Sequence, residues 1–365
     1  MEGISMVLEN LNGAVQALEN IKKKGNLLDE SELATAYTMR GLFYFQIHRF
    51  DESISDLNKS IEIMERLITE GKSPNANELG KSYSVRGMTY HIIGENEKAL
   101  PDISKSIDIL ESLQVRGQLI EESDLLTMYL FRGGILNSMN NYMDDAISDY
   151  RKSIAIAEKL IREGKPFDEG RIVNSFMGIA QSYDQKEEFA EANKYYSKCI
   201  DIWEQIINEG QPLSDESNLA TAYMNRGINY RIMGENARAF SDHNKCVSIR
   251  ERLKSQGIEQ NVHFISLSYR NRAVSYKVAN NKEAAIKDYI SAIRSIKEIF
   301  NERSELQRVY YRILAELIDL VIDENNETLI NNIVQEYLYS MRSIPKTEEA
   351  EEVQNNILER LDFDK

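Results

Sequence analysis

The most regular feature of this chain is a pattern of apolar positions separated by three and four residues. Between Tyr37 and Gly71 this spacing places the apolar side chains on one face of a helix. A polar interval near Arg49 divides the stretch in two, and Gly71 stands where a second helix would end. The pattern therefore predicts two amphipathic helices joined by a tight turn.

The same pattern recurs every 46 or 47 residues, and three separate series of residues keep that period. They are a glycine at the predicted end of the second helix, an aromatic residue in the first helix, and a small residue four positions later. Agreement of three series predicts six copies of one two-helix unit. The glycines are Gly25, Gly71, Gly117, Gly164, Gly210 and Gly257; the aromatics are Tyr37, Tyr83, Tyr129, Phe176, Tyr223 and Tyr269; the small residues are Gly41, Gly87, Gly133 or Gly134, Ala180, Gly227 and Ala273.

The second helix of each unit has its own alternation of small and large residues. A small residue lies twelve positions after the small slot of the first helix, and a large residue follows four positions later. Small residues on facing helices allow close approach, which the large residues then fill. The small positions are Ser53, Ala99, Ala146, Ala192, Ala239 and Ala285, and the large positions are Leu57, Ile103, Tyr150, Tyr196, His243 and Tyr289.

These offsets resemble those of the tetratricopeptide repeat. The resemblance implies an all-α fold, a right-handed superhelical solenoid of stacked antiparallel helix pairs. The period is longer than the family's usual length of about 34 residues, and the family's proline near the end of the second helix is missing. We assign the extra residues to a longer second helix and a longer connector, for instance from Lys72 to Glu78. The third unit slips by one residue at Asn140 and Asn141.

Three segments follow from this pattern: residues 1–25, 26–300 and 301–365. The first is an amino-terminal half repeat with Leu11, Ala14, Val15 and Leu18 on its packing stripe, and it is either an end cap or a contact surface for another chain. The second holds the six extended repeats. The third is predicted to be an acidic helical cap, with a helix around 313–321, another from 328 to 341 and a third after Pro345 that ends near Leu361.

Composition and charge narrow the classes of partner. The 365 residues carry a formal net charge of −15, which argues against nucleic acid, since such a partner needs a basic surface. No run of 18 apolar residues and no signal peptide are visible at the sequence level, so we expect no membrane span and a cytoplasmic location. The two cysteines, Cys199 and Cys246, fall at equivalent positions and are predicted to be buried and unlinked.

A pair of charged slots varies together between copies. Just before the small slot of the first helix, five copies carry arginine, and the same five carry aspartate on the second helix. The fourth copy lacks both, with Ile179 and Tyr195 instead. Because an unpaired buried charge is costly, joint loss predicts an Arg–Asp bridge between the helices, with phosphate binding by the arginines as the alternative. The pairs are Arg40–Asp56, Arg86–Asp102, Arg132–Asp149, Arg226–Asp242 and Arg272–Asp288.

The search for chemistry gives no catalytic, cofactor or metal site. The four histidines have no ligand spacing such as H-E-x-x-H, and Gly133-Gly134 lies in a helical pattern without a phosphate-binding motif. His243 and Trp203 occupy core positions. The prediction is a protein that is not an enzyme and needs no cofactor.

In the family that the chain resembles, the first helices line the inner wall of a groove. The face that points away from the aromatic slots here includes Thr38, Leu42 and Ser84, and becomes basic towards the carboxyl end. Methionines suit an adaptable peptide-binding surface, and an ordinary solvated face is the alternative. The predicted binding residues are Met88, His91, Met177, Gln181, Met224, Asn225, Ile228, Arg231, Arg270, Asn271 and Lys277.

The sequence therefore predicts a non-catalytic scaffold or adaptor for a protein or peptide segment. An acidic segment or a free carboxylate would suit the basic end of the wall. Two alternatives stay open: a peptide-sensing regulatory receptor whose superhelix responds to its ligand, and a scaffold that self-assembles through its amino-terminal half repeat. The expected state is a monomer or a weak dimer.

Overall fold

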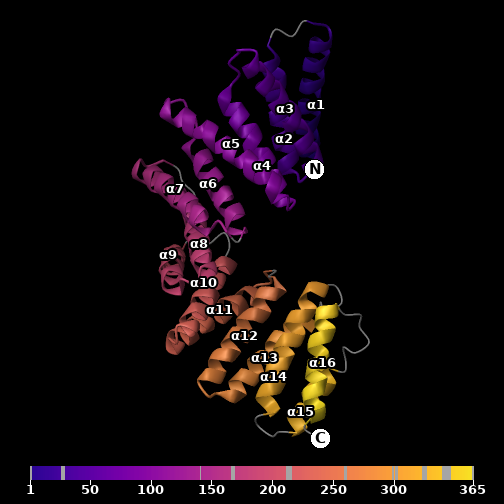
Figure 1. The fold of residues 1–365 in the computed structure, drawn as a ribbon, viewed down its shortest axis with the longest axis vertical. Helices are drawn as coiled ribbons and strands as arrows, with labels where there is room; N and C mark the ends of the chain where they lie inside the picture. The colour runs from indigo at the N-terminus through magenta and orange to yellow at the C-terminus, as the bar shows by residue number, and fades with distance from the viewer. Residues whose placement is uncertain are drawn as a thin grey trace. The chain divides into compact units, whose positions relative to one another are not determined.

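The computed structural model of the chain describes residues 2–25, 29–139, 141–165, 169–210, 216–258, 261–297, 300, 303–322, 327–338 and 347–363. In these residues the secondary structure is helical, without a strand (Figure 1). The chain divides into two compact units, Met1–Glu187 and Glu188–Lys365, and each is described by itself.

In the first unit, an opening helix is followed by three complete helix pairs and the first helix of a fourth. Each second helix packs on the first helix of its own repeat and on the first helix of the next one. First helices also contact the next first helix, so they form one layer and the second helices form another. The helices are α1 Glu2–Lys23, α2 Glu30–Gln46, α3 Phe50–Thr69, α4 Ala76–Ile92, α5 Asn96–Val115, α6 Glu122–Asn137, α7 Met143–Arg162 and α8 Glu169–Gln185.

The second unit continues the same plan and ends in helices that no longer follow the repeat. Packing runs from α9 to α14 in chain order, and α15 and α16 both pack on α14. The predicted all-α solenoid of stacked antiparallel helix pairs is confirmed. The helices are α9 Phe189–Asn208, α10 Glu216–Ile232, α11 Asn236–Ser255, α12 Val262–Val278, α13 Lys282–Lys297, a 3-10 turn Ser304–Leu306, α14 Gln307–Ile322, α15 Glu327–Ile333 with a π segment Val334–Leu338, and α16 Glu348–Phe363.

The predicted glycine stops are confirmed by their backbone. All six have positive φ, between 63° and 76°. At Gly71 the amide donates to the carbonyl of Ile68 (3.0 Å) and the amide of Lys72 donates to that of Leu67 (2.9 Å), which is the glycine-dependent ending of a helix. A Cβ at Gly71 would meet no atom within 4 Å, so backbone conformation rather than space selects glycine there.

The connector after Gly71 is shorter than predicted. Asn75 caps α4, its side chain accepting from the amide of Asn77 (3.0 Å), and the helix begins at Ala76. The predicted connector reaching Glu78 was therefore wrong. The second helix of this repeat is longer than the first, since α5 has 20 residues and α4 has 17.

The small slots permit a close approach of the paired helices. A Cβ built on Gly87 would lie 2.7 Å from Cδ1 of Ile103, and one on Gly133 would lie 2.9 Å from Cε1 of Tyr150. Real side chains do not tolerate such distances, so a larger residue would push the helices apart. The predicted pairing of small and large positions is confirmed in these repeats.

An aromatic cluster extends the core of the sixth repeat to the point where the repeat pattern fades. The rings of Phe300, Tyr310 and Tyr311 lie 5.0 to 5.8 Å apart in edge-on contacts. Ala350 and Ile357 bring α16 into the same core. The helix predicted around residues 313–321 is part of α14. Met341 and Pro345, which bounded the other predicted helices, lie outside the described residues, and the three-segment division of the chain stays a prediction.

Candidate functional site

Five Arg–Asp ion pairs join the two helices of a repeat in the described part of the chain. In the second repeat, Arg86 Nε donates to Asp102 Oδ2 (2.6 Å) and Nη2 donates to Oδ1 (2.7 Å). The aspartate side chain is 8% exposed and the arginine side chain 18%. The predicted Arg–Asp bridge is confirmed. The other four are Arg40–Asp56, Arg132–Asp149, Arg226–Asp242 and Arg272–Asp288.

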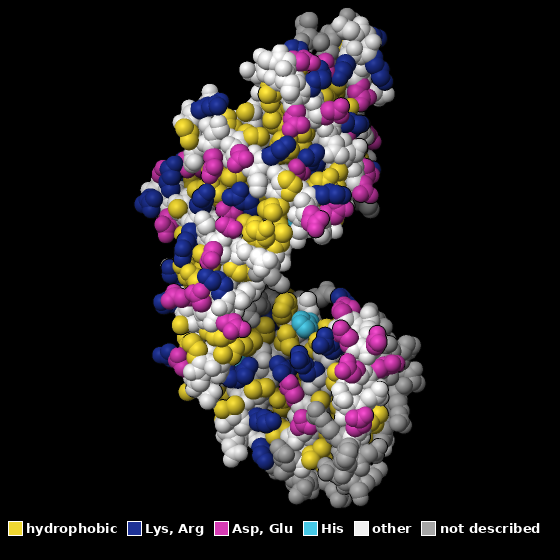
Figure 2. Space-filling view, in the orientation of Figure 1, with side chains coloured by type: hydrophobic (Ala, Val, Ile, Leu, Met, Phe, Trp, Pro, Cys, Tyr) yellow, Lys and Arg dark blue, Asp and Glu magenta, His cyan; other side chains and the backbone are white. Residues whose placement is uncertain are grey.

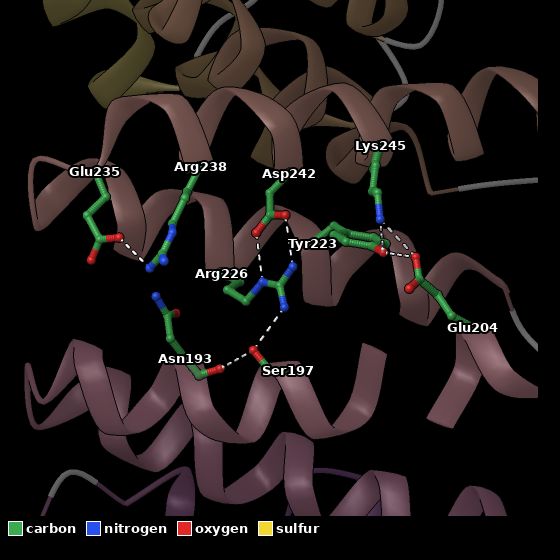
Figure 3. Close-up of polar contacts among 9 residues, drawn as sticks. All are labelled: Asn193, Ser197, Glu204, Tyr223, Arg226, Glu235, Arg238, Asp242 and Lys245. Atoms are coloured by element: carbon green, nitrogen blue, oxygen red, sulfur yellow. Dashed lines mark hydrogen bonds and ion pairs between the residues drawn. The ribbon is translucent and has the colours of Figure 1, made fainter. Parts of the chain in front are cut away.

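The bridging arginines also reach the preceding repeat. Arg226 Nη1 donates to the hydroxyl of Ser197 on α9 (2.9 Å), as Figure 3 shows, and Arg86 Nη1 donates to Asn58 (2.7 Å). Burial lowers the pKa of Arg226, but the hydrogen bond to Asp242 and the negative charge of that carboxylate together outweigh burial, so the pKa is raised. These guanidinium groups bind the protein itself, which leaves phosphate binding without support.

A second recurring contact links neighbouring repeats and was missed in the sequence. The Tyr223 hydroxyl donates to Glu204 of the preceding helix, and Lys245 Nζ lies 2.8 Å from that hydroxyl and 2.9 Å from Glu204 Oε1 (Figure 3). Burial, followed by the bond to Glu204, raises the pKa of Tyr223 to about 12, so the hydroxyl keeps its proton. Equivalent contacts are Tyr37–Glu19, Tyr83–Glu65–Lys105, Tyr129–Glu111–Lys152 and Tyr269–Glu251. A glutamate 18 or 19 residues before each tyrosine was the available signal.

The layer of first helices in the first unit carries a hollow of about 300 Å³. Its lining includes three residues of the predicted wall, Leu42 on α2 and Ser84 and Met88 on α4. Val85 and Met128 add to its apolar surface. The arrangement is a shallow apolar depression reached from three successive first helices.

The charged residues that line this hollow are mainly acidic. Glu78, Glu121 and Asp124 line it, together with one amine, that of Lys81. The Glu78 Oε2 atom is buried and has no hydrogen-bond partner among the described residues. A carboxylate oxygen removed from water without a donor is unfavourable, and a cationic or amide group placed in the hollow would satisfy it.

The remaining wall residues of the first unit keep partial access to solvent. His91 Nδ1 lies 2.8 Å from Asn96 Oδ1, and its ring packs edge-on against Phe131. Met177 is half-buried and Gln181 is exposed. Each of these first-helix residues leaves atoms free for a ligand.

In the second unit the wall combines apolar and basic groups. Ile228 is half-buried, Lys277 is exposed, and the Nε of Arg231 is buried without a hydrogen-bond partner among the described residues. Asn225 Nδ2 donates to the hydroxyl of Tyr196 (3.2 Å). Figure 2 shows Lys and Arg side chains gathered over α11 to α13 on the face in view.

Arg270 is already paired within the protein. Its guanidinium forms a bidentate contact with Glu316 of α14, with Nη2 2.5 Å from Oε1. A ligand carboxylate would have to compete with this bond. The positive charge predicted for the carboxyl end of the wall therefore lies mainly on Arg231 and Lys277, which form no ion pair in the described residues.

Two predicted binding residues do not belong to an accessible wall. Met224 is 4% exposed and Asn271 is 3% exposed, so neither side chain offers an accessible surface to a ligand in this structure. First helices pack on one another, and the hydroxyl of Ser268 on α12 lies 3.9 Å from Met224 Sδ. Thr38 is buried for the same reason, bonded to Ser60 (2.8 Å) and Ser82 (2.7 Å). The helical offsets predicted which face of each first helix these residues share. They did not predict which part of that face packs against the next first helix.

The two cysteines and His243 are buried. Cys199 and Cys246 are unlinked, and burial raises the pKa of both thiols, which disfavours the reactive thiolate. His243 Nδ1 lies 2.8 Å from the Ser275 hydroxyl, and burial, followed by the charge of Arg231, lowers its pKa to about 4. The described residues contain no group of three side chains suited to a metal ion.

Comparison with known families decides the identity of the repeat. The sequence signature of the tetratricopeptide repeat matches residues 219–253, and a second signature of the same description matches residues 34–65 and 173–203. Each match begins in a first helix and ends in the second helix of the same repeat. The chain is a tetratricopeptide repeat protein. Repeats of this family generally serve as non-catalytic interaction scaffolds.

Solved structures show the same fold at low sequence identity. A Signal Transduction ATPase with Numerous Domains from Pyrococcus horikoshii, described as having a tetratricopeptide repeat sensor, is 15% identical with a TM-score of 0.59 and is matched over 100% of this chain and 50% of its own. The apo form of RapI is 14% identical with a TM-score of 0.57, over 95% and 81%. BtubC from P. vanneervenii is 19% identical with a TM-score of 0.53, over 68% and 92%.

A search of the curated proteins finds no match. In the part of the chain that the structure describes, every helix is too short or too polar to cross a membrane.

Proposed function

We propose that this tetratricopeptide repeat protein is a non-catalytic adaptor that binds a peptide or protein segment along the accessible side of its first helices. The observation that carries the proposal is the hollow of about 300 Å³ in the first unit, because its lining includes Leu42, Ser84 and Met88. A depression of this size suits one or two side chains of an extended segment.

Charge refines the kind of segment each unit would accept. In the first unit, the lining residues Glu78, Glu121 and Asp124 outnumber Lys81 and favour a cationic side chain whose apolar stem lies on the floor. In the second unit, Arg231 and Lys277 favour an acidic side chain or a terminal carboxylate. Met88 and Met177 supply an adaptable apolar surface.

Pull-down with paired variants tests the proposal. Met88→Glu in the first unit and Ile228→Glu in the second place a charge on half-buried wall positions, whereas Met224 is unsuitable because it is buried. Ile161→Glu changes an exposed apolar residue on a second helix and serves as the control. Mass spectrometry of retained proteins is expected to show partners lost by the wall variants and kept by the control. Identical partners for wild type and both wall variants, with unchanged helical circular dichroism, would overturn the proposal.

A sensor is the second candidate function. It is favoured by the fold similarity to the Pyrococcus horikoshii protein, whose repeats are described as a sensor. A receptor changes the shape of its repeat array when a ligand binds, whereas an adaptor keeps it. Small-angle scattering of the protein with and without a captured peptide separates the two. An unchanged radius of gyration supports the adaptor, and a changed one supports the sensor.

A further inference from the structure

Helix α1 presents an apolar stripe to solvent. Ile4 is 51% exposed, Val7 is 39% exposed and Ile21 is 40% exposed. They belong to a series at positions 4, 7, 11, 14, 18 and 21, whose steps of three and four residues are those of the seam between two coiled helices. The other members are Leu11, Ala14 and Leu18.

The equivalent stripe is covered in the next repeat. A shift of 46 residues places Leu11 at Leu57, Leu18 at Met64 and Ile21 at Leu67, and these residues of α3 are almost fully buried. Leu57 is covered by the first helix of its own repeat, where a Cβ on Gly41 would lie 2.9 Å from it. On α1, four of the six stripe residues are exposed and only Leu11 and Leu18 are half-buried, so a helix could occupy this surface.

The sequence of α1 departs from the others where a first helix would bind. Val7 replaces the small residue, Ser53 in α3, that permits close approach. Asn10 stands at the position that Asp56 occupies in α3, where Asp56 forms the bridge to Arg40 of α2. Both changes disfavour a helix of the repeat type and favour a partner at the wider spacing of ordinary helix packing, about 8–10 Å.

We propose that a second copy of this chain covers the stripe, with the two α1 helices antiparallel. In this arrangement, each stripe residue of one copy lies opposite a stripe residue of the other copy, and the two residue numbers add up to 25. Apolar side chains then face apolar side chains along the whole stripe, so the stripe is complementary to itself. Ile4 meets Ile21, Val7 meets Leu18, and Leu11 meets Ala14 of the other copy. A two-fold interface requires such self-complementarity.

Charge and dipoles select the antiparallel orientation. The carboxyl end of α1 carries Lys22, Lys23 and Lys24. A parallel pair would bring the lysines of both copies together, whereas an antiparallel pair separates them and opposes the helix dipoles. The contact with α2 uses mainly another side of α1, where Val15 is buried and Asn12 accepts from Arg40 (3.1 Å). Leu18 lies at the edge between the two sides, because it is half-buried and packs against the core that contains Val15 and Leu33. The dimer therefore leaves the first repeat intact.

Light scattering with matched variants tests the dimer. Over about 1 to 500 μM the full chain is expected to change from 42.0 kDa to twice that mass. Ile4→Glu with Ile21→Glu should keep the mass at 42.0 kDa throughout. Met6→Glu with Ala17→Glu, at exposed positions of α1 off the stripe, should dimerise like wild type. A wild-type mass that stays monomeric at every concentration overturns the proposal, and so does a stripe variant that still dimerises.

Cysteine cross-linking tests the orientation. Ile4→Cys with Ile21→Cys should form covalent dimers on mild oxidation, because residues 4 and 21 of the two copies are adjacent. Each single variant should remain uncross-linked, since identical positions lie about 25 Å apart along the helices. The native cysteines, Cys199 and Cys246, are buried and provide no background. Cross-linking by the single variants would overturn the antiparallel arrangement. Met88→Glu should leave dimerisation unchanged, which separates this interface from the proposed peptide wall.

Discussion

The second and fourth repeats have helices of the same lengths, 17 and 20 residues, but only the second repeat carries an arginine and an aspartate at the paired slots. Arg86 and Asp102 form a bidentate ion pair with little solvent access. In the fourth repeat Ile179 and Tyr195 take these slots, and Ile179 is fully buried. The boundary between the two compact units also lies in this repeat.

This difference indicates that the arginine and aspartate positions are replaced together. A buried ion pair offsets its desolvation cost only when both partners are present, and apolar residues of similar volume can replace the pair with little loss. Loss of one partner is the damaging event because it leaves the other charge buried and unpaired. The fourth repeat is a natural example of the joint exchange.

Breaking the bridge on one side should give the largest effect. Asp102→Ala leaves the Arg86 guanidinium without its carboxylate, and we expect the free energy of unfolding to fall by about 3 kcal/mol or more. Chemical denaturation followed by circular dichroism measures the change. Arg86→Ile combined with Asp102→Tyr copies the fourth repeat and should recover at least about 1 kcal/mol of that loss. A double variant as unstable as the sum of its single variants would contradict the pairing.

His243, the large residue of the fifth repeat, should make the free energy of unfolding depend on pH. His243 has a pKa of about 4 in the folded chain, below the ordinary value of 6.5. Folding favours the neutral imidazole of His243. The contribution of this group to the free energy of unfolding is therefore complete above about pH 6.5 and is lost as the pH falls towards 4. The decrease in the free energy of unfolding is at most about 3 kcal/mol.

The fourth repeat provides the matched variant for this test. It has Tyr196 in the large slot. His243→Tyr should therefore flatten the difference between pH 6.5 and 4 when denaturation curves of wild type and variant are subtracted. An identical pH dependence in both proteins would show that His243 does not carry the effect.

The tyrosine contact offers a smaller test of the same comparison. In the second repeat, the Tyr83 hydroxyl bonds to Glu65 and accepts from Lys105 (3.0 Å), whereas the fourth repeat has Phe176 in this slot. Tyr83→Phe should lower the free energy of unfolding by about 1 kcal/mol, because it removes the hydroxyl but leaves the ring. Thermal and chemical denaturation would both detect it. A change below about 0.3 kcal/mol would mean that the bonds of the Tyr83 hydroxyl to Glu65 and Lys105 add no stability beyond what bonds to water would give.

Exposed ion pairs should give the smallest effect. Arg49 and Glu52 form an ion pair in which both side chains are more than two-fifths exposed. Glu52→Gln is expected to change the free energy of unfolding by less than about 1 kcal/mol, since solvent competes for both charges. The same denaturation measurements check this. A loss as large as that of Asp102→Ala would show that burial is not what separates the two pairs.

Repetition explains how much of the fold could be predicted from sequence. Six copies in one chain act as an internal comparison. The Gly87–Ile103 packing could be predicted because residue size recurs at these positions, and the Arg86–Asp102 bridge because both charges are lost together in one copy. The glycine stops were predictable for a local reason, because positive φ at positions such as Gly71 favours one residue type.

The candidate site was less predictable because its residues differ between copies. Helical offsets placed Met224 on the wall, but the neighbouring first helix covers it, and that contact depends on how closely two repeats stack. The pairing of Arg270 with Glu316 also escaped prediction, since α14 lies beyond the regular repeats. Contacts between repeats, rather than within one, were the missing information.

The regular spacing of the tyrosine–glutamate contact makes the chain divisible into interchangeable parts. Glu65 and Glu111 occupy the same site in successive copies, as do Tyr83 and Tyr129. Deletion of residues 72–117 would bring Tyr129 to Glu65 and restore an equivalent junction. A deletion that does not remove a whole number of repeats would move a tyrosine away from its glutamate. Evolution can therefore lengthen or shorten such a chain by duplicating or losing whole helix pairs, and intermediate lengths are selected against.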